Sequence, residues 1–159
     1  MNLTEVLELT FGIKENADVS LHDCRTNRVQ CEEQFIRFFI PGGFYVIHDE
    51  KRPDTAENRN AEVTCRFMDR YEDRFQVTVY RKNLWGRIVR RDWTDEFAAA
   101  VNSGKVEFEF VTTYRAYHNV LFKGYIWRHR RPWWRECEID LMTDEITYTW
   151  EEREAEDEQ

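Results

Sequence analysis

Residues 137–150, CEIDLMTDEITYTW, decide the predicted fold, because every second position on both sides of a four-residue loop is apolar or cysteine. Alternate residues of a strand share one face, so the pattern predicts two strands that each bury one side. The residues predicted to face the core are Cys137, Ile139, Leu141, Ile146, Tyr148 and Trp150. With residues 142–145 as the loop, 141 pairs with 146 and 137 with 150. The stretch therefore predicts an antiparallel hairpin whose register is fixed by its apolar face.

The same alternation occurs earlier in the chain and predicts a second hairpin. Its apolar positions are Val63, Cys65, Phe67, Phe75, Val77 and Val79. Pairing 67 with 75 places all six side chains on one side. A further hairpin is predicted from residues 35–40 and 44–49, which flank the turn sequence Pro41-Gly42-Gly43. Two more strands are predicted from residue 106 past Tyr114 and over residues 120–127, with His118-Asn119 as the turn between them.

Helical spacing appears in two places. Leu3, Val6, Leu7 and Thr10 predict a first helix, which Asn2 would cap and Gly12 would end. Thr94 would cap a short second helix that buries Phe97 and Val101 and ends at Gly104. Residues 14–34 are polar and fit a further helix that ends near Cys31, and residues 49–61 are predicted to form an exposed loop.

These elements predict an α+β fold, with one large, mostly antiparallel curved sheet and a few short helices. The chain of 159 residues fits a single domain, which we place at residues 1–150. An all-β barrel is the alternative fold. Residues 151–159, EEREAEDEQ, contain no apolar side chain larger than alanine, so they predict a disordered acidic tail.

The net charge of −8 conceals three blocks of different sign. Residues 1–73 carry a net charge of −6, and residues 136–159 carry −10. Between them, residues 74–135 hold 13 basic and 5 acidic side chains, a net charge of +8. A basic block inside an acidic chain indicates a surface for an anionic partner. The acidic tail would either aid solubility alone or lie over the basic block and compete with that partner.

The basic block ends in a segment that combines arginine with tryptophan, GYIWRHRRPWWRE, residues 124–136. Arginine neutralises phosphate and a planar aromatic ring stacks on a base. We therefore interpret the chain as a non-enzymatic binding or regulatory protein that holds nucleic acid, a nucleoprotein or an acidic protein surface. The predicted binding residues are Arg128, Arg130, Arg131, Trp133, Trp134 and Arg135, with Arg87, Arg90 and Arg91 as a second positive cluster. A small accessory or inhibitor protein of a phage or mobile element would fit this size and composition.

Three alternatives stay open. The tryptophans could belong to the core, with the arginines stacked on them. His118 and His129 could form the acid–base pair of a small metal-independent phosphodiesterase or nuclease. Finally, the acidic first block and the tail could imitate nucleic acid and occupy a basic protein.

The cysteines and the N-terminal segment favour an intracellular, cytoplasmic protein. The residues 1–13, MNLTEVLELTFGI, lack the basic segment of a signal peptide, and no apolar run reaches the roughly 18 residues of a spanning helix. We therefore expect free thiols at Cys24, Cys31, Cys65 and Cys137. We also expect no cofactor and no metal, although His22-Asp23-Cys24 followed by Cys31 offers the ligand types of a zinc site.

Overall fold

The computed structural model describes residues 4–10, 17–48, 58–69 and 73–152, which form antiparallel sheets and one helix. The first sheet has the order β1 (Thr4–Thr10), β13 (Thr143–Glu152), β7 (Asn58–Phe67), β5 (Phe35–Ile40) and β4 (Arg28–Cys31). The second has the order β3 (Cys24–Thr26), β10 (Val106–Ala116), β11 (Asn119–Arg128), β12 (Trp134–Leu141), β8 (Phe75–Lys82) and β9 (Ile88–Asp92). A two-stranded sheet pairs β2 (Ala17–Ser20) with β6 (Tyr45–His48), and the helix is α1 (Thr94–Asn102).

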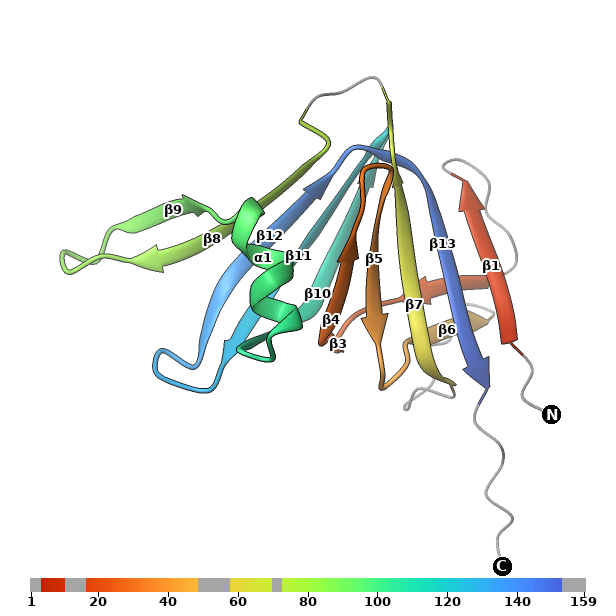
Figure 1. Cartoon of the computed structure of the whole chain (residues 1–159), viewed down its shortest axis with the longest axis horizontal. Helices are drawn as coiled ribbons and strands as arrows, with labels where there is room; N and C mark the ends of the chain where they lie inside the picture. Colours follow the sequence, from red (N-terminus) through yellow and green to blue (C-terminus); the bar gives the residue numbers. More distant parts are fainter. Residues whose placement is uncertain (1–3, 11–16, 49–57, 70–72, 153–159) are drawn as a thin grey trace, which may run out of the picture.

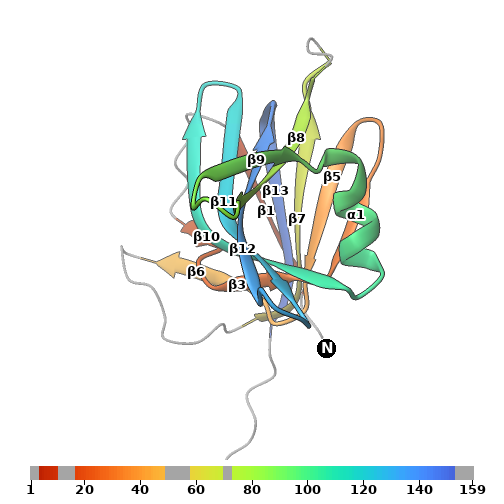
Figure 2. The same ribbon diagram turned by 90° about the vertical axis from the view of Figure 1, so that its left-hand side faces the viewer.

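The two large sheets face each other across an aromatic core (Figures 1 and 2). Phe38 of β5 meets Phe110 of β10 and Phe122 of β11, with ring centroids 5.4 and 5.8 Å apart and near-perpendicular planes. All three rings are fully buried. The fold is therefore mainly β, and the predicted α+β label fits it only loosely. Among the described residues the edge strands of one sheet do not pair with those of the other, so no closed barrel forms.

The predicted C-terminal hairpin is wrong. β12 pairs with β11 and β8 in the six-stranded sheet, whereas β13 pairs with β1 and β7 in the five-stranded sheet. A single residue, Met142, separates the two strands, and the chain crosses there from one sheet to the other. The Met142 N–H donates to the Arg74 carbonyl, and the Met142 carbonyl accepts from the Met68 N–H.

The strands predicted on either side of His118-Asn119 do pair, as β10 and β11. Two further predicted hairpins are wrong for the same reason as the C-terminal one. β7 and β8 lie in different sheets, as do β5 and β6. The predicted inward faces are nevertheless confirmed, because nearly all of the alternating residues are buried and only Phe75 is partly exposed. Two strands that face each other across a sandwich show the same inward alternation as two neighbours in one sheet. Periodicity therefore identified the buried face without identifying the neighbouring strand.

The predicted N-terminal helix is also wrong, because residues 4–10 form the edge strand β1. Seven consecutive residues pair with β13, from Thr4 opposite Glu151 to Thr10 opposite Glu145. Pairing along a whole strand outweighs a short helical pattern that contains β-branched Thr and Val residues. Its expected cap and stop, Asn2 and Gly12, lie outside the described residues. The polar segment 17–31 forms β2, β3 and β4 rather than a helix, and within the predicted loop 49–61 residues 58–61 belong to β7.

The second predicted helix is confirmed as α1, with Phe97 and Val101 buried, but its N-cap residue is Trp93 and not the predicted Thr94, whose hydroxyl accepts instead from the Val77 N–H. Asp92 accepts hydrogen bonds from the Thr94 N–H and hydroxyl at 3.0 and 2.6 Å, which orders the turn into the helix. At the other end, Asn102 donates to the Val29 carbonyl and accepts from the Val29 N–H, both at 2.8 Å. The helix is thereby tied to the edge strand β4 and flanks the open side between the sheets (Figure 1). No helix of the described residues is long and apolar enough to cross a membrane.

Candidate anion-binding site

At one end of the six-stranded sheet, the face that packs into the core changes from apolar side chains to arginines. On β11 the core face carries Val120, Phe122 and Ile126 and then Arg128. On β12 the corresponding run from Leu141 towards the start of the strand ends at Arg135, which lies opposite Ile126. Since alternate residues share a face, both guanidinium groups continue the core face where the other sheet no longer covers it.

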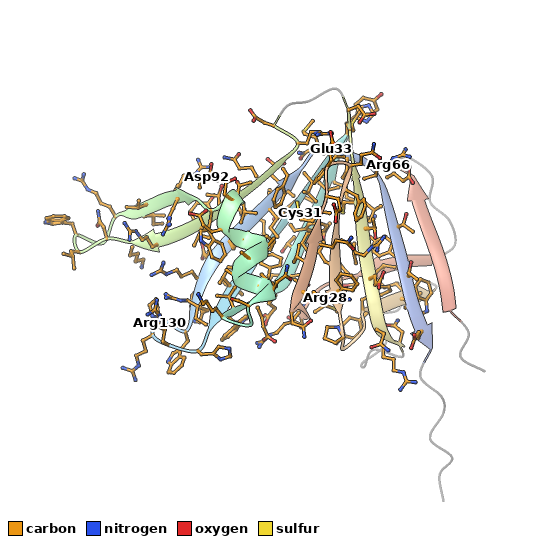
Figure 3. All side chains as sticks on the ribbon, viewed as in Figure 1. Arg28, Cys31, Glu33, Arg66, Asp92 and Arg130 are labelled. Carbon is orange, nitrogen blue, oxygen red and sulfur yellow. The ribbon has the colours of Figure 1, made fainter. Side chains whose placement is uncertain are left out.

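These arginines line a cavity of about 560 Å³, which we call the arginine pocket. Its lining residues are Val79, Arg91, Trp93, Ala100, Lys105, Val106, Ile126, Arg128, His129, Arg130 and Arg135. The sheet supplies an apolar floor, α1 and the turn that follows it form one wall, and the β11–β12 turn forms the rim. Figure 3 shows Arg130 on that turn.

All charged side chains among the described residues that line the pocket are basic. Five lining residues are Arg or Lys, and no described lining residue is acidic. Arg91 has an exposed partner in Glu96 at 3.4 Å, but no described carboxylate forms an ion pair with Arg128, Arg130 or Arg135. Burial, and then the neighbouring charges of Arg128, Arg81, Arg91 and Arg130, lower the pKa of Arg135. Its Nε is buried without a hydrogen-bond partner among the described residues.

A second hollow adjoins the arginine pocket, and we call it the tryptophan groove. It has a volume of about 1140 Å³ and is lined by residues 80–85, 88 and 131–136 of the β8–β9 hairpin and the β11–β12 segment. Three indole rings stand exposed here, Trp85 at 83%, Trp133 at 52% and Trp134 at 49%. Arg135 lines both the groove and the pocket, so the two hollows meet at this residue.

The structure brings most of the predicted binding residues together. Arg91, Arg128, Arg130 and Arg135 line the pocket, and Arg131, Trp133, Trp134 and Arg135 line the groove. The other two predicted residues line neither hollow. Arg90 stacks over Tyr80, with its guanidinium carbon 5.8 Å from the ring centroid, and the Arg87 N–H donates to the Asn83 side chain at 2.9 Å in the hairpin turn.

Sequence reasoning missed Lys105, Trp93 and the tip of the β8–β9 hairpin. Lys105 follows the helix at a position that no periodicity marks. The tip, by contrast, carried a readable pattern, because Leu84 and Trp85 precede Gly86 in a turn where large apolar residues have no core to enter. Their exposures of 97% and 83% show that the turn presents both side chains to solvent.

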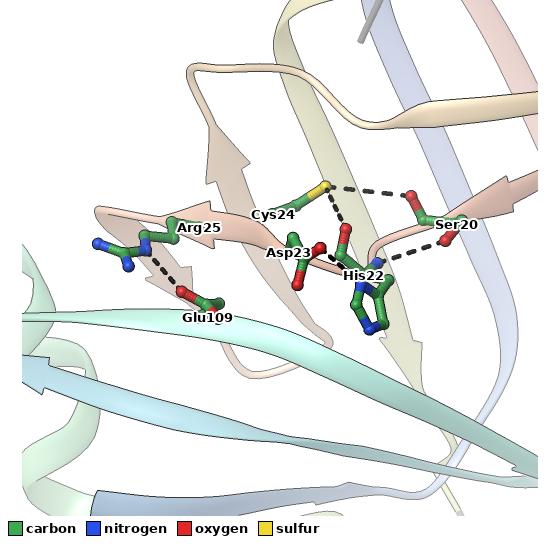
Figure 4. Close-up of polar contacts among 6 residues, drawn as sticks. All are labelled: Ser20, His22, Asp23, Cys24, Arg25 and Glu109. Atoms are coloured by element: carbon green, nitrogen blue, oxygen red, sulfur yellow. Dashed lines mark hydrogen bonds and ion pairs between the residues drawn. The ribbon is translucent and has the colours of Figure 1, made fainter. Parts of the chain in front are cut away.

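The opposite face of the sheet carries Tyr125, Trp127 and Trp134, and the rings of Tyr125 and Trp134 meet edge to face with centroids 5.0 Å apart. Arg25 stacks over Trp127 at 4.5 Å from the ring centroid and also pairs with Glu109 at 2.8 Å. This matches the alternative in which arginine and tryptophan cover each other, and among the described residues it does so for Trp127. Figure 4 shows the Arg25–Glu109 contact beside the turn that precedes Cys24.

The two histidines of the alternative nuclease are not brought together. His118 precedes β11 and His129 follows it, so a strand of ten residues, about 33 Å long, separates them. His129 instead contacts the Gly104 carbonyl through Nε2 at 3.1 Å, and His118 adopts a positive φ in the β10–β11 turn. The imidazole rings of His118 and His129 are therefore too far apart to act on one phosphodiester.

The cysteines form no disulfide, and no group of three metal-ligating side chains occurs within the described residues. Cys24 is buried and its Sγ lies 3.8 Å from the His22 carbonyl and 4.0 Å from the Ser20 carbonyl, while the His22 ring pairs with Asp23 at 2.8 Å (Figure 4). The thiol is therefore directed at backbone oxygens. Cys31 is exposed on the edge strand β4.

No protein-family model, no curated protein and no solved structure matches the chain, so its function has to be argued from the arginine pocket and the tryptophan groove themselves.

Proposed function

We propose that the protein binds single-stranded nucleic acid without catalysis, with phosphate held in the arginine pocket and bases stacked in the tryptophan groove. The observation that carries the proposal is the one-sided charge of the pocket, where five Arg and Lys side chains converge with no acidic lining residue among those described. Cations that repel one another at close range favour an anionic ligand, which removes the repulsion on binding.

The groove supports nucleic acid over other anions. Exposed indole rings stack on bases of any sequence, at roughly 1–3 kcal/mol per base. Arg135 lines both hollows, so in this proposal one strand places a phosphate in the pocket and a neighbouring base in the groove. Arginine also supplies a planar fork of donors that matches phosphate oxygens.

The groove also favours a single strand over a duplex. The rings of Trp85, Trp133 and Trp134 can stack only on bases that are not already stacked and paired with others. In a duplex the ligand would present its backbone alone, and the indoles would contribute little.

The test is titration of a fluorescein-labelled 12-nucleotide single strand, followed by anisotropy, over a series of salt concentrations. The logarithm of the affinity should fall with the logarithm of salt by about 0.7 per contacted phosphate. Arg128→Gln should weaken binding and flatten this slope by roughly 0.7. The matched control is Arg66→Gln, which removes the same charge from β7 in the other sheet, where Arg66 pairs with Glu145 (Figure 3).

A second pair of measurements separates stacking from charge. Trp134→Ala should weaken the single strand several-fold with no change in the salt slope, and the matching duplex should bind more weakly than the single strand. Two results would reject the proposal: no binding at 10 mM salt, or equal losses in Arg128→Gln and Arg66→Gln. Binding of polyglutamate in place of nucleic acid would support an acidic protein partner instead.

A further inference from the structure

Two turns meet where they border the arginine pocket. The His129 Nε2 to Gly104 carbonyl contact, at 3.1 Å, joins the β11–β12 turn to the turn that follows α1. Lys105 and Val106 lie directly after that contact and line the pocket beside Ala100 of α1. We interpret these joined turns as the end of the path for a strand that enters from the groove past Arg135.

The charge of the pocket also exceeds what an internal phosphate can neutralise. A phosphodiester carries one negative charge, whereas a terminal phosphate monoester carries about 1.5 to 2 at neutral pH and offers three oxygens. Arg128, Arg130 and Arg135 have no ion-pair partner among the described carboxylates. Several guanidinium groups around one centre suit a dianion that each can approach with a charge-assisted hydrogen bond.

Resting on the proposed function, we propose that the arginine pocket recognises the terminal phosphate monoester of a nucleic-acid strand, whose adjoining bases lie in the tryptophan groove. The protein is then a reader of phosphorylated strand ends. The buried, unpartnered Arg135 Nε supplies a donor at the junction, where the terminal phosphate meets the first nucleoside.

The experiment compares five forms of one 12-nucleotide strand on the wild-type protein by competition at about 0.15 M salt. They are the 5′-hydroxyl form, the 5′-phosphate, the 5′-methyl phosphate, the 3′-phosphate and a circular form without ends. One phosphorylated end, 5′ or 3′, should bind about tenfold more tightly than the 5′-hydroxyl strand. The methyl phosphate keeps the position but removes the second charge, so when the 5′ end is the preferred one it should lose most of this gain.

Variants then locate the preference. In Arg128→Gln the ratio between phosphorylated and hydroxyl strands should fall to within about twofold of unity, and Arg128→Lys should restore part of it by keeping the charge. Trp134→Ala should weaken both strands equally and leave the ratio unchanged. Arg66→Gln should change neither the affinities nor the ratio, because its side chain lies on the other sheet.

The outcomes separate this inference from the proposed function. If all five forms bind equally, end recognition is overturned while single-strand binding stands. If no form binds but inorganic phosphate or a nucleoside monophosphate does, the proposed function fails, and the inference that rests on it fails too. A phosphate preference that survives in Arg128→Gln would also overturn the inference, since the preference would then lie outside the arginine pocket.

Discussion

In the proposed function, Arg135 serves binding at the expense of stability. It continues the core face of β12 beyond Cys137, yet it places a cation where its neighbours are Arg128, Arg91 and an apolar floor. Burial first, and then the surrounding arginines, lower the pKa of its guanidinium. Such a group destabilises the ligand-free protein, and an anion relieves the cost.

Replacing Arg135 with Gln should therefore leave the ligand-free protein as stable or more stable, by up to about 1 kcal/mol at low salt, while it weakens oligonucleotide binding. Urea unfolding at 10 mM and 0.5 M salt measures the effect, which should shrink as salt screens the repulsion. Arg66→Gln serves as the control and should lose a little stability, because it breaks the pair with Glu145. A large loss of stability in Arg135→Gln would show that the side chain holds the fold rather than a ligand.

Cys65 permits a second test at the residue scale. Complete burial raises the pKa of its thiol to about 12, against an ordinary value of 9.0. Because the pKa of this thiol is higher in the folded state, the unfolded state loses the thiol proton first as pH rises. The contribution of Cys65 to the free energy of unfolding is therefore fully present below pH 9 and declines from pH 9 towards pH 12. Cys65→Ala removes this dependence. The difference in unfolding free energy between the wild type and Cys65→Ala, measured by urea unfolding, should therefore decrease by about 2 kcal/mol between pH 9 and pH 11. A constant gap would contradict the buried, protonated thiol.

At the scale of elements, the helix α1 matters through its contact with an edge. Its last residue, Asn102, occupies both the donor and the acceptor of Val29 on β4 with hydrogen bonds of 2.8 Å. A side-chain amide can imitate a backbone peptide in this way and protect an edge strand from pairing with another chain. The same anchor keeps Ala100 against the arginine pocket.

Asn102→Ala should cost about 1–3 kcal/mol, because the two Val29 backbone groups lose their partners together. The control is Ser103→Ala, one residue on, which removes only a hydroxyl contact to the Ala100 carbonyl and should cost less than about 1 kcal/mol. Chemical unfolding measures both. Equal costs in the two variants would show that the edge contact contributes nothing specific.

The hairpin β10–β11 depends on a close approach at Gly124. A Cβ at this position would lie 1.8 Å from the Glu109 carbonyl oxygen and 2.9 Å from Phe108 Cζ, beside the irregular register between Phe110 and Thr112. Gly124→Ala should therefore cost 3 kcal/mol or more, roughly the upper range of overpacking effects. Gly42→Ala, where nothing lies within 4 Å of the added Cβ, should change stability by less than about 1 kcal/mol. Similar melting temperatures for both variants would show that the sheet adjusts.

These elements also show how far the sequence could predict the molecule. Alternation identified the buried faces of β7, β8, β12 and β13, because the period of a strand is a local property. It could not distinguish a neighbour in the same sheet from a strand across the core, since both point inward. The candidate binding residues near Arg128 and Trp134 could be named from the sequence because they are contiguous in it. Lys105 and Trp93 were not, because only the packing of α1 brings them to the arginine pocket.

At the scale of the whole molecule, the charge blocks of the sequence separate in space. Residues 74–135, with a net charge of +8, supply β8, β9, α1, β10 and β11, which belong to the six-stranded sheet and its helix. The five-stranded sheet comes from the two acidic blocks. Along the long axis of Figure 1, the β8–β9 hairpin and the β11–β12 turn lie at one end and the last residue of β13 towards the other. Attraction of an anion to the basic end therefore does not require the chain as a whole to be basic.

The strand β13 extends into the segment that the sequence predicted as an acidic tail. β13 continues through Glu152, and Glu151 accepts a hydrogen bond from Asn60 at 3.0 Å, so the first two residues of the predicted tail belong to the sheet. Residues 153–159 lie outside the described residues. Their sequence holds four acids and one arginine, so a truncation after Glu152 raises the net charge by 3. Seven residues reach at most about 24 Å from that end, which favours an effect through the electrostatic field rather than through contact with the pocket.

Truncation after Glu152 should leave the unfolding free energy unchanged within about 0.5 kcal/mol, because the segment holds no large apolar side chain. The affinity for a single strand should rise about two- to fivefold at 0.01 M salt, where the Debye length is about 30 Å, and stay unchanged near 1 M, where it is about 3 Å. A variant that keeps the length, with glutamine or asparagine for the four acids, should behave like the truncation. A gain that persists at 1 M salt would mean that the tail contacts the binding surface directly, and no gain at 0.01 M would mean that its charge does not reach the arginine pocket.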